Sequence, residues 1–291
     1  MASAPSGNSW SSIVIDAHQH FWRYDEQEHP WITPDMAPLR RHFGPQELKL
    51  EMDAAGVTGA VSVQARSSFE ETEWLLAIAA EHDFILGVVG WIDLASPGVG
   101  DDLDRYAGHR KFKGVREVCQ GAPDEQFFAK RSFNDGIRAL TERSLTYDLL
   151  IYSNQLAAAT TFVDRHPNQQ FVVDHCAKPE IAGGDVSARW RRDISELARR
   201  PQVACKLSGL VTEIRDEQAT FDAAVVRPYL DAALDAFGPD RLMVGSDWPV
   251  LALRSTYGAW MSEASRWLTG YSESISRAIR SETARRVYKL D

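Results

Sequence analysis

The chain has 291 residues, a formal net charge of −9 at pH 7, and 44% hydrophobic and 10% aromatic residues. This composition suits a globular protein with a large core. The negative charge, without a run of Lys and Arg, argues against nucleic acid or an anionic membrane as a partner. No apolar run reaches the roughly 18 residues of a membrane-spanning helix, so we expect a soluble protein.

The three cysteines, Cys119, Cys176 and Cys205, form an odd set without a Cys-x-x-Cys spacing. This pattern does not suit a disulfide framework or a zinc knuckle, and it favours the reducing cytoplasm. Residues 1–12 are small and polar and lack the features of a secretory signal. We predict a flexible leader over residues 1–12 and one domain over residues 13–291.

The first predicted strand lies within Ile13–Trp22, where a β-branched run leads into Asp-Ala-His-Gln-His. Side chains alternate between the two faces of a strand, so Asp16, His18 and His20 are expected to point the same way. Two imidazoles at a strand end can bind a metal ion or a substrate oxygen. They can equally be polar residues satisfied within a loop, and the residues downstream decide between these interpretations.

Residues 23–44 are too broken by Pro30, Pro34 and Pro38 to form a regular helix. A loop of this length inside a compact domain is usually functional or disordered, and its aromatic residues favour a packed lid.

From residue 45 onward, segments of helical and strand-like periodicity alternate. We predict helices over residues 45–55, 70–82, 103–109, 133–144, 156–166, 189–200, 227–237 and 274–290. The intervening strands are predicted over residues 60–64, 84–91, 112–118, 146–152, 170–175, 203–207 and 242–247. With the opening strand, this arrangement predicts eight parallel strands joined by right-handed crossovers.

Eight such units at this length predict a (β/α)₈ barrel in a single domain, an α/β fold. The rival architecture is an open, doubly wound sheet, which commonly carries a Gly-rich phosphate loop after its first strand. Here that position holds His18, Gln19 and His20 instead. No shift in composition marks a second domain.

A barrel brings all eight strand ends to one face, where the active sites of this fold lie. In chain order the polar and aromatic residues at these ends are His18, His20, Gln64, Arg66, Trp91, Asp93, Arg116, Glu117, Tyr152, Asn154, Asp174, His175, Lys178, Lys206, Ser208, Asp247 and Trp248. Any one of them can be an ordinary hydrogen-bonded residue of the rim. The joint presence of three histidines and an aspartate is harder to ascribe to chance and predicts a hydrolytic site.

Four motifs, taken together, resemble the amidohydrolase superfamily. They are Asp-Ala-His-Gln-His-Phe-Trp at the start, Lys-Gly-Val-Arg on the fourth strand, Val-Val-Asp-His-Cys-Ala-Lys-Pro on the sixth and Val-Gly-Ser-Asp-Trp-Pro on the eighth. Within the superfamily they are similar to the sugar-acid lactonases that open L-fucono- and L-rhamnonolactones. The resemblance runs from Ile13 to about Leu290 and implies a (β/α)₈ barrel.

Members of this superfamily bind one or two divalent metals, and the resemblance carries this role to His18, His20, His175 and Asp247, with Glu117 as a fourth-strand ligand. The fifth strand of this chain has no histidine, so two metals are not expected. The resemblance implies either one divalent metal, zinc above all, held by His18, His20, Glu117 and Asp247, or a metal-free site.

A lactone has a better leaving group than an amide and therefore demands less of the site. We hypothesise that Asp247 is the general base for the attacking water, ideally with a raised pKa, and that His175 orients that water or the carbonyl. His18 and His20, a metal that they hold, or Arg116 would stabilise the developing oxyanion.

The expected partner is a small sugar lactone, bound by neutral donors and acceptors beside an aromatic wall. The residues predicted to bind it are Trp22, Arg116, Glu117, Tyr152, Lys178 and Trp248, with further contributions from Trp31, Trp91 and Asn154. The alternatives are a pyrone-dicarboxylate lactonase or a metal-dependent decarboxylase, which would need several of Arg66, Lys113, Arg116, Lys178 and Lys206 to hold carboxylates. A third reading is a sugar-binding barrel without catalysis.

Overall fold

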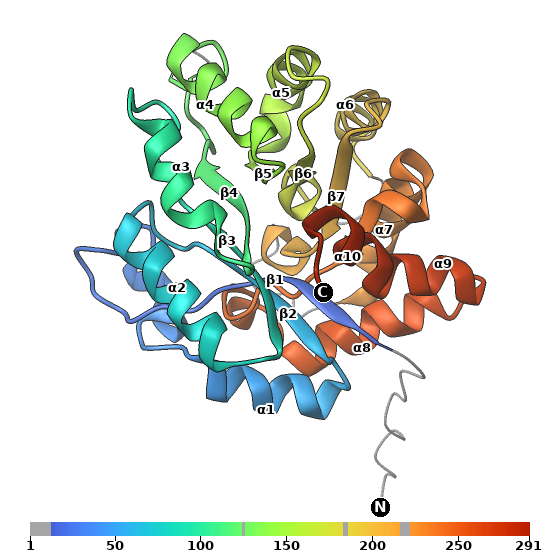
Figure 1. The fold of residues 1–291 in the computed structure, drawn as a ribbon. Coiled ribbons are helices and arrows are strands. Elements are labelled where there is room, and N and C mark those ends of the chain that lie inside the picture. The colour runs from blue at the N-terminus through green and yellow to red at the C-terminus, as the bar shows by residue number, and fades with distance from the viewer. Residues whose placement is uncertain (1–12, 124–125, 183–185, 216–221) are drawn as a thin grey trace, which may run out of the picture.

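The computed structural model describes residues 13–123, 126–182, 186–215 and 222–291; the predicted leader lies outside them. Eight parallel strands form one sheet in the order β1 to β8. The strands are β1 (Ile15–Gln19), β2 (Gly59–Val63), β3 (Ile85–Gly90), β4 (Phe112–Val118), β5 (Thr146–Leu150), β6 (Phe171–Val173), β7 (Val203–Leu207) and β8 (Leu242–Val244). Figure 1 shows the helices arranged around them, so the predicted (β/α)₈ barrel is confirmed.

The helices that follow the first seven strands are α1 (Pro45–Ala55), α2 (Phe69–Glu81), α3 (Val99–Ala107), α4 (Arg131–Glu142), α5 (Leu156–Asp164), α6 (Ala188–Ala198) and α7 (Ala223–Phe237). After β8 come α8 (Tyr257–Leu268), α9 (Glu273–Arg277) and α10 (Thr283–Tyr288). The larger apolar core lies between the helices and the outer faces of the strands. Each helix is thus held by its apolar stripe against the sheet.

Two parts of the predicted helix pattern were wrong. We did not predict α8, although Tyr257, Trp260, Met261 and Ala264 follow helical spacing and Thr256 caps the helix by accepting a hydrogen bond from the Ala259 amide. The predicted closing helix over 274–290 is divided into α9, a π-helical turn over Ala278–Glu282, and α10. The local widening of such a turn changes which faces of the flanking segments meet the barrel.

Strands β6 and β8 end earlier than predicted, at Val173 and Val244. After β6 the chain enters a turn in which His175, Cys176, Ala177 and Lys178 all have φ between 48° and 58°, which is the left-handed region. A left-handed backbone cannot continue a strand, so β6 ends before the length predicted from the sequence.

The barrel is closed by a seam between the end of β1 and the residues that follow β8. The Asp247 amide donates to the His18 carbonyl at 2.8 Å, and the His20 amide donates to the Trp248 carbonyl at 2.7 Å. The seam thus contains residues predicted to form the site.

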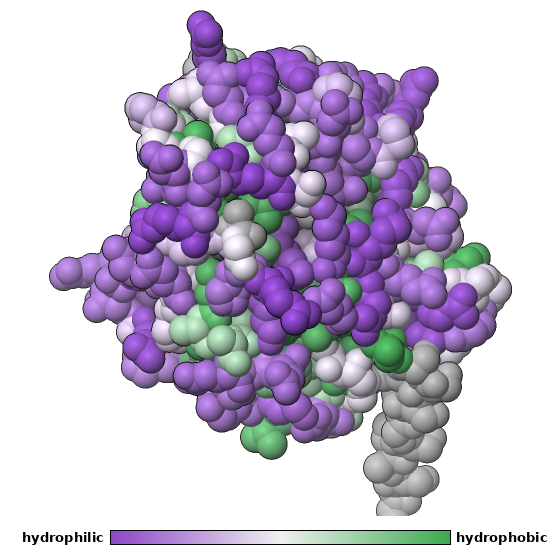
Figure 2. Space-filling view, in the orientation of Figure 1, coloured by the Kyte–Doolittle hydropathy of each residue, from purple (hydrophilic) through white to green (hydrophobic). Residues whose placement is uncertain are grey.

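The end of the barrel opposite this site is closed by α10. A second apolar cluster joins barrel residues such as Val61, Val172 and Met243 to Val287 and Tyr288 of this helix. Figure 1 is viewed toward that end, with α10 in front of the strands. On the face shown in Figure 2, hydrophilic residues predominate and hydrophobic ones lie in separate patches.

Residues 23–44 pack as an ordered segment that includes a 3₁₀-helix over Pro34–Leu39. Its ends are joined because the amides and carbonyls of Trp22 and Phe43 exchange two hydrogen bonds, at 3.2 and 3.0 Å. Within this segment the side chains of Ile32 and Leu39 are buried. Among the described residues, no helix is long and apolar enough to cross a membrane.

His166, just after α5, should make stability depend on pH. Its ring is buried against Phe162, Nε2 lies 2.8 Å from Asn134 Oδ1, and burial lowers its pKa to about 4. In the unfolded chain a histidine has a pKa of about 6.5 and is protonated below that pH, whereas the buried ring stays neutral down to about pH 4. The free energy of unfolding therefore falls as the pH is lowered from about 6.5 to about 4.

We expect the wild type's advantage in unfolding free energy over His166→Gln to shrink between pH 7 and pH 4.5. Urea titrations of both proteins at several pH values measure this difference. An advantage that stays constant with pH would contradict the role of His166.

Candidate active site

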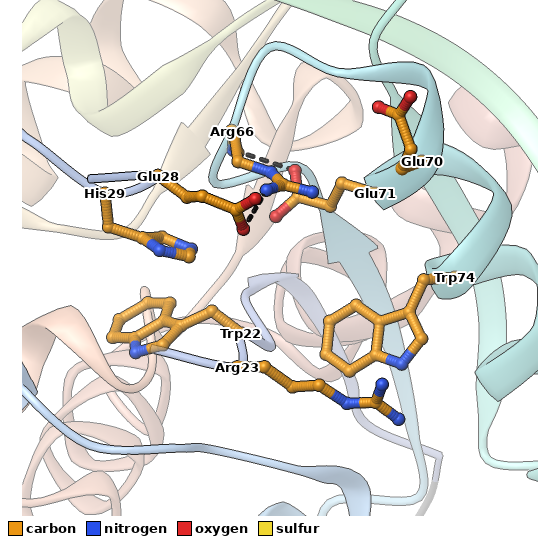
Figure 3. Close-up of a pocket in the computed structure, with 8 residues that line it drawn as sticks. All are labelled: Trp22, Arg23, Glu28, His29, Arg66, Glu70, Glu71 and Trp74. Carbon is orange, nitrogen blue, oxygen red and sulfur yellow. Dashed lines mark hydrogen bonds and ion pairs between the residues drawn. The ribbon is translucent and has the colours of Figure 1, made fainter. Parts of the chain in front are cut away.

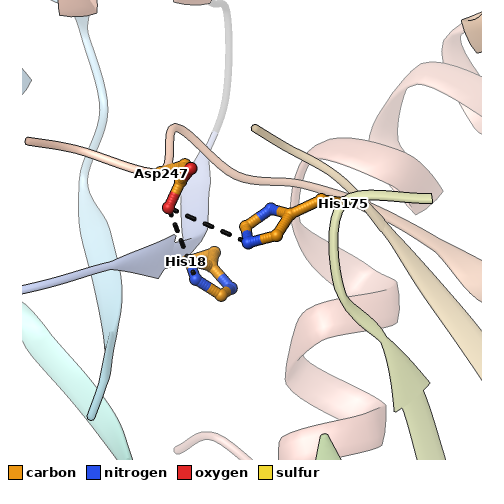
Figure 4. A group of neighbouring side chains, drawn as sticks. All are labelled: His18, His175 and Asp247. Atoms are coloured by element: carbon orange, nitrogen blue, oxygen red, sulfur yellow. Dashed lines mark ion pairs between the residues drawn. The ribbon is translucent and has the colours of Figure 1, made fainter. Parts of the chain in front are cut away.

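Three imidazoles converge on one carboxylate at the open end of the barrel. Figure 4 shows two of them, His18 and His175, with Asp247. His18 and His20 come from the end of β1, His175 from the turn after β6, and Asp247 from the segment after β8. Asp247 Oδ1 lies 3.3 Å from His20 Nε2, 3.7 Å from His18 Nε2 and 3.9 Å from His175 Nε2. All four side chains are buried. The structure thus gathers the histidines and the aspartate selected from the sequence.

These distances suit a metal ion. A tetrahedral zinc with ligands at about 2.0–2.1 Å places its ligand atoms about 3.3 Å apart. The Nε2 atoms of His18 and His20 are 3.1 Å apart, and the separations from Asp247 Oδ1 run from 3.3 to 3.9 Å, at or a little above this value. His18, His175 and Asp247 offer ligand atoms that all lie within 4.8 Å of one another. The set of nitrogen and oxygen donors fits a single divalent ion.

Hydrogen bonds on the far side of the rings orient the histidines. His20 Nδ1 lies 2.7 Å from the Val63 carbonyl, which can only accept, so Nδ1 carries a proton and, in the neutral ring, the lone pair of Nε2 is free for a metal ion. His175 Nδ1 lies 2.9 Å from Ser208 Oγ. Such outer contacts set the tautomer of a metal-binding histidine and hold its ring in place.

A buried network of charges lies beneath His18. Lys206 Nζ is 2.6 Å from Asp148 Oδ2, 3.0 Å from Asp174 Oδ1 and 3.0 Å from His18 Nδ1. Arg116 Nη1 pairs with Asp174 Oδ2 at 3.1 Å. Lys206 and both aspartates are fully buried, so their charges depend on one another for compensation.

The network extends to the closed end of the barrel through Tyr288 of α10. Its hydroxyl donates to Asp148 Oδ2 at 2.8 Å. A chain of direct contacts therefore joins α10 to the ring of His18.

Burial and neighbouring charges shift the pKa values of the site in opposite directions. Burial lowers the pKa of His175 to about 4, so this imidazole is neutral at pH 7. Burial alone would raise the pKa of Asp247, but His175, His20 and His18 outweigh it and hold the pKa below its usual range. This is the reverse of the upward shift that we considered ideal for a general base, and it keeps Asp247 ionised.

Several residues that carry these groups have strained backbone conformations. Four consecutive residues other than glycine, His175 to Lys178, occupy the left-handed region, as does Asp247 with φ 61°. Such residues are unfavourable by about 1–2 kcal/mol each and cluster at functional sites. Gly209 is required beside them, because a Cβ atom there would lie 2.5 Å from His175 Nδ1 and 3.0 Å from Asp247 Oδ2.

A cavity of about 170 Å³ opens onto the cluster. Its lining consists of His20, Trp31, Ala65, Arg116, Val118, Gln120, Leu150, His175, Lys178, Asp247 and Val250. Trp31 closes one side and is fixed by a hydrogen bond from Nε1 to the Ala65 carbonyl at 3.1 Å. The lid segment therefore supplies part of the cavity wall.

Of the six residues predicted to bind substrate, only Arg116 and Lys178 line this cavity. Glu117, also predicted as a metal ligand, points elsewhere and accepts a hydrogen bond from Trp91 Nε1 at 2.7 Å. The pleat of β4 explains the difference, because neighbouring residues face opposite sides and Arg116 takes the inner one.

The other three residues predicted to bind substrate, Tyr152, Trp248 and Trp22, also lie outside the lining of this cavity. Tyr152 is 44% exposed, and Trp248 is buried against Phe21 and Phe43. Trp22 lines a different pocket, under residues 23–44 and at the start of α2, where it and Trp74 lie along one side and Glu28, Arg66 and Glu71 along the other (Figure 3).

Sequence reasoning missed the network partner Asp148 and the cavity residues Val118, Gln120, Leu150 and Val250. Asp148 had a detectable signal, since it is a lone charge within an otherwise apolar strand. The cavity residues had none, because their position depends on the curvature of the barrel and on the turns after the strands.

An eight-stranded barrel with a buried histidine and aspartate cluster at the strand ends defines a metal-site hydrolase of the amidohydrolase type. A family model described as amidohydrolase matches residues 15–290, and the chain belongs to this family. The family expected from the sequence motifs is therefore confirmed.

Individual relatives agree. An L-fucono-1,5-lactonase of Burkholderia multivorans is 39% identical over 287 residues, covering 96% of this chain and 97% of that protein. A crystal structure of an amidohydrolase from Burkholderia multivorans with bound Zn has a TM-score of 0.92 at 39% identity, covering 96% of this chain and all of the other. The predicted zinc or other divalent metal is thus supported by a related structure and by the donor set described above.

A structure described as a 2-pyrone-4,6-dicarboxylic acid hydrolase from Pseudomonas putida has a TM-score of 0.74 at 21% identity, covering 95% of this chain and 97% of the other. At that identity the likeness concerns the fold alone.

Proposed function

We propose that this protein is a lactonase that opens a sugar-acid lactone of the L-fucono- or L-rhamnono- type to the free acid, in sugar catabolism. The observation that carries the proposal is the cluster of His18, His20, His175 and Asp247 at the mouth of the cavity. The 39% identity to an L-fucono-1,5-lactonase over nearly the whole chain supports the substrate class.

In the proposed reaction, a water oxygen attacks the lactone carbonyl while Asp247 accepts a proton from that water. The ring carbon–oxygen bond then breaks, and the ring oxygen takes up a proton to become a hydroxyl. A divalent metal held by His18, His175 and Asp247 would supply a Lewis acid at this point. The downward-shifted pKa of Asp247 suits a water that has itself been acidified by nearby positive charge.

Arg116 and neutral His175 complete the site. The Arg116 guanidinium lies 3.4 Å from His18 Nε2 and lines the cavity, where its charge can stabilise the oxyanion that develops on the carbonyl. His175 keeps a fixed ring orientation through Ser208 and so can orient the water. Lys178 follows His175 in the same turn and also lines the cavity, where its ammonium group can donate to a hydroxyl group of the sugar.

The dicarboxylate alternative is less well supported by the placement of its cations. Arg66 pairs with Glu28 beside a different pocket, and Lys206 is buried below the cluster. Arg116 is paired with Asp174 and Lys178 with Glu213 at 3.0 Å. Arg116 and Lys178 are thus each partly neutralised by one carboxylate, which leaves donors for a single developing oxyanion but little positive charge for two substrate carboxylates. A non-catalytic barrel has no need of strained residues that hold an aspartate against three histidines.

The three cysteines are free and buried. A reducing compartment would leave them so, and on that basis we propose a cytoplasmic location.

A substrate panel tests the proposal. Freshly prepared L-fucono-1,5-lactone, L-rhamnonolactone and 2-pyrone-4,6-dicarboxylate are offered to the zinc-loaded enzyme, and acid release is followed above the spontaneous rate. We expect turnover of a sugar lactone, little turnover of the dicarboxylate, and loss of activity on chelation that returns with added zinc. Metal analysis should find one ion per chain.

Preference for the dicarboxylate would replace the proposed substrate class. Binding of sugar lactones without turnover, in a protein that contains its metal, would indicate the non-catalytic barrel. Full activity after verified metal removal would show that the chain's own residues suffice.

A further inference from the structure

The cavity has two chemically different halves. The reaction centre, with His20, His175 and Asp247, lies at the ends of β1, β6 and β8. At the ends of β4 and β5, Val118 and Leu150 form an apolar patch of the wall, with Arg116 and Gln120 on either side of Val118 in the sequence. The two walls therefore meet different parts of a bound substrate.

Strand pairing explains why the second wall is apolar. Val118 is opposite Leu150 in the register of β4 and β5, and Arg116 is opposite Asp148 two residues earlier. Residues two apart on a strand share a face. An apolar layer therefore lies directly above the charged layer that holds His18.

Val118 is 40% exposed, although it is a large aliphatic residue next to a polar centre. Its side chain lines the cavity, so this exposed surface is available to a ligand. The neighbouring Gln120 also lines the cavity, and its Nε2 is buried without a hydrogen-bond partner among the described residues. The wall thus offers a substrate one apolar surface and one free donor.

We propose that Val118 and Leu150 select sugar lactones that carry a methyl group, rather than a hydroxymethyl group, on the carbon attached to the ring oxygen. This inference rests on the proposed function. In a 1,5-lactone of a 6-deoxyhexonic acid, that carbon is joined through the ring oxygen to the carbonyl carbon. A carbonyl at the histidine and aspartate centre can therefore bring the methyl group to the nearby wall of β4 and β5.

The size of the preference follows from the wall's chemistry. A hydroxyl group pressed against valine and leucine loses its water without gaining a partner, whereas a methyl group gains apolar contact. An apolar pocket discriminates against an added hydroxyl by up to about 100-fold. We expect the wild type to favour the methyl compound by about 10- to 100-fold in kcat/KM. The free donor of Gln120 is left for a ring hydroxyl that both compounds share.

The test compares L-fucono-1,5-lactone with L-galactono-1,5-lactone, which differ only in methyl against hydroxymethyl at that carbon. Val118→Thr keeps the shape of the side chain but replaces one methyl group by a hydroxyl, so it should reduce the preference about tenfold or more. Because Val118 is partly exposed, this variant should fold. Leu50→Thr is the matched control, since Leu50 is 72% exposed on α1 and is not part of the cavity lining.

Gln120→Met provides a second, independent readout. It should raise KM for both lactones by the same factor and leave their ratio unchanged. A wild-type ratio near one that Val118→Thr does not alter would overturn the inference while leaving the lactonase proposal intact. A ratio that changes in Gln120→Met and not in Val118→Thr would overturn it too, by assigning the selection to the amide. Failure of the zinc-loaded wild type to open either of these lactones or L-rhamnonolactone would instead refute the proposed function.

Discussion

Asp247→Asn is expected to lower kcat for a sugar lactone by about 1,000-fold, within the range lost when a positioned proton acceptor is removed. The amide has the size of the carboxylate but cannot take a proton from the attacking water. It also removes the negative charge that faces His18, His20 and His175, and with it a charged ligand for a divalent metal. Steady-state kinetics on zinc-loaded protein, together with metal analysis, separate the loss of the base from the loss of the metal.

Glu117→Gln is the matched control, because it makes the same carboxylate-to-amide change at a neighbouring strand end. Its side chain contacts Trp91 and Ser67 rather than the histidines. We expect nearly unchanged kcat and an unchanged metal content. If Asp247→Asn retains turnover within tenfold of the wild type, Asp247 is not the base. If Glu117→Gln loses the metal, the ligand role implied by the family resemblance is restored.

Lys206→Met should produce the largest loss of stability. The substitution leaves the buried carboxylates of Asp148 and Asp174 without their shared cation, and breaking a buried pair in this way is destabilising by about 3–5 kcal/mol. Burial raises the pKa of Asp148 to about 6 even with Lys206 present, so this carboxyl is mostly ionised at pH 7. The loss should therefore be greater at pH 7 than at pH 5, where Asp148 is mostly protonated. Urea titrations at both pH values measure it.

Lys49→Met makes the same replacement at an exposed ion pair with Asp53 on α1. Such pairs contribute less than about 1 kcal/mol, so this variant should unfold at nearly the urea concentration of the wild type. Equal effects of the two substitutions would mean that the network beneath His18 is not held together by its lysine.

Most of the fold could be predicted because alternation between strand and helix is a local signal. The helix at Pro45–Ala55 and the strands at Phe112–Val118 and Val203–Leu207 agree with prediction at both ends. The errors occur where tertiary structure overrides the pattern, as in the left-handed turn after β6. The π-helical turn before α10 is a similar case. The omission of α8 was avoidable, since its apolar spacing and its cap are both visible in the sequence.

The candidate site could be predicted only in part. Residue type and strand order selected His18, His20, His175 and Asp247, because parallel strands of a barrel end at one face. The same reasoning could not tell which of Arg116 and Glu117 faces the cavity. Adjacent residues of a strand point to opposite faces of the sheet, and one sequence does not show which face is the inner one. Trp22 was a similar case, because an aromatic residue has the same appearance in sequence whether it lines a site or packs beneath a loop.

The seam that closes the barrel gives the site a mechanical role. His18 and His20 lie on the first strand and Asp247 follows the last, so an ion bound by residues from both strands bridges the two edges that would otherwise separate. Any ligand that binds only the closed form lowers the population of open forms in proportion to its affinity and concentration. A metal ion that serves catalysis would thus also hold the first and last strands together. The metal concentration would then affect the stability of the folded barrel as well as its rate of turnover.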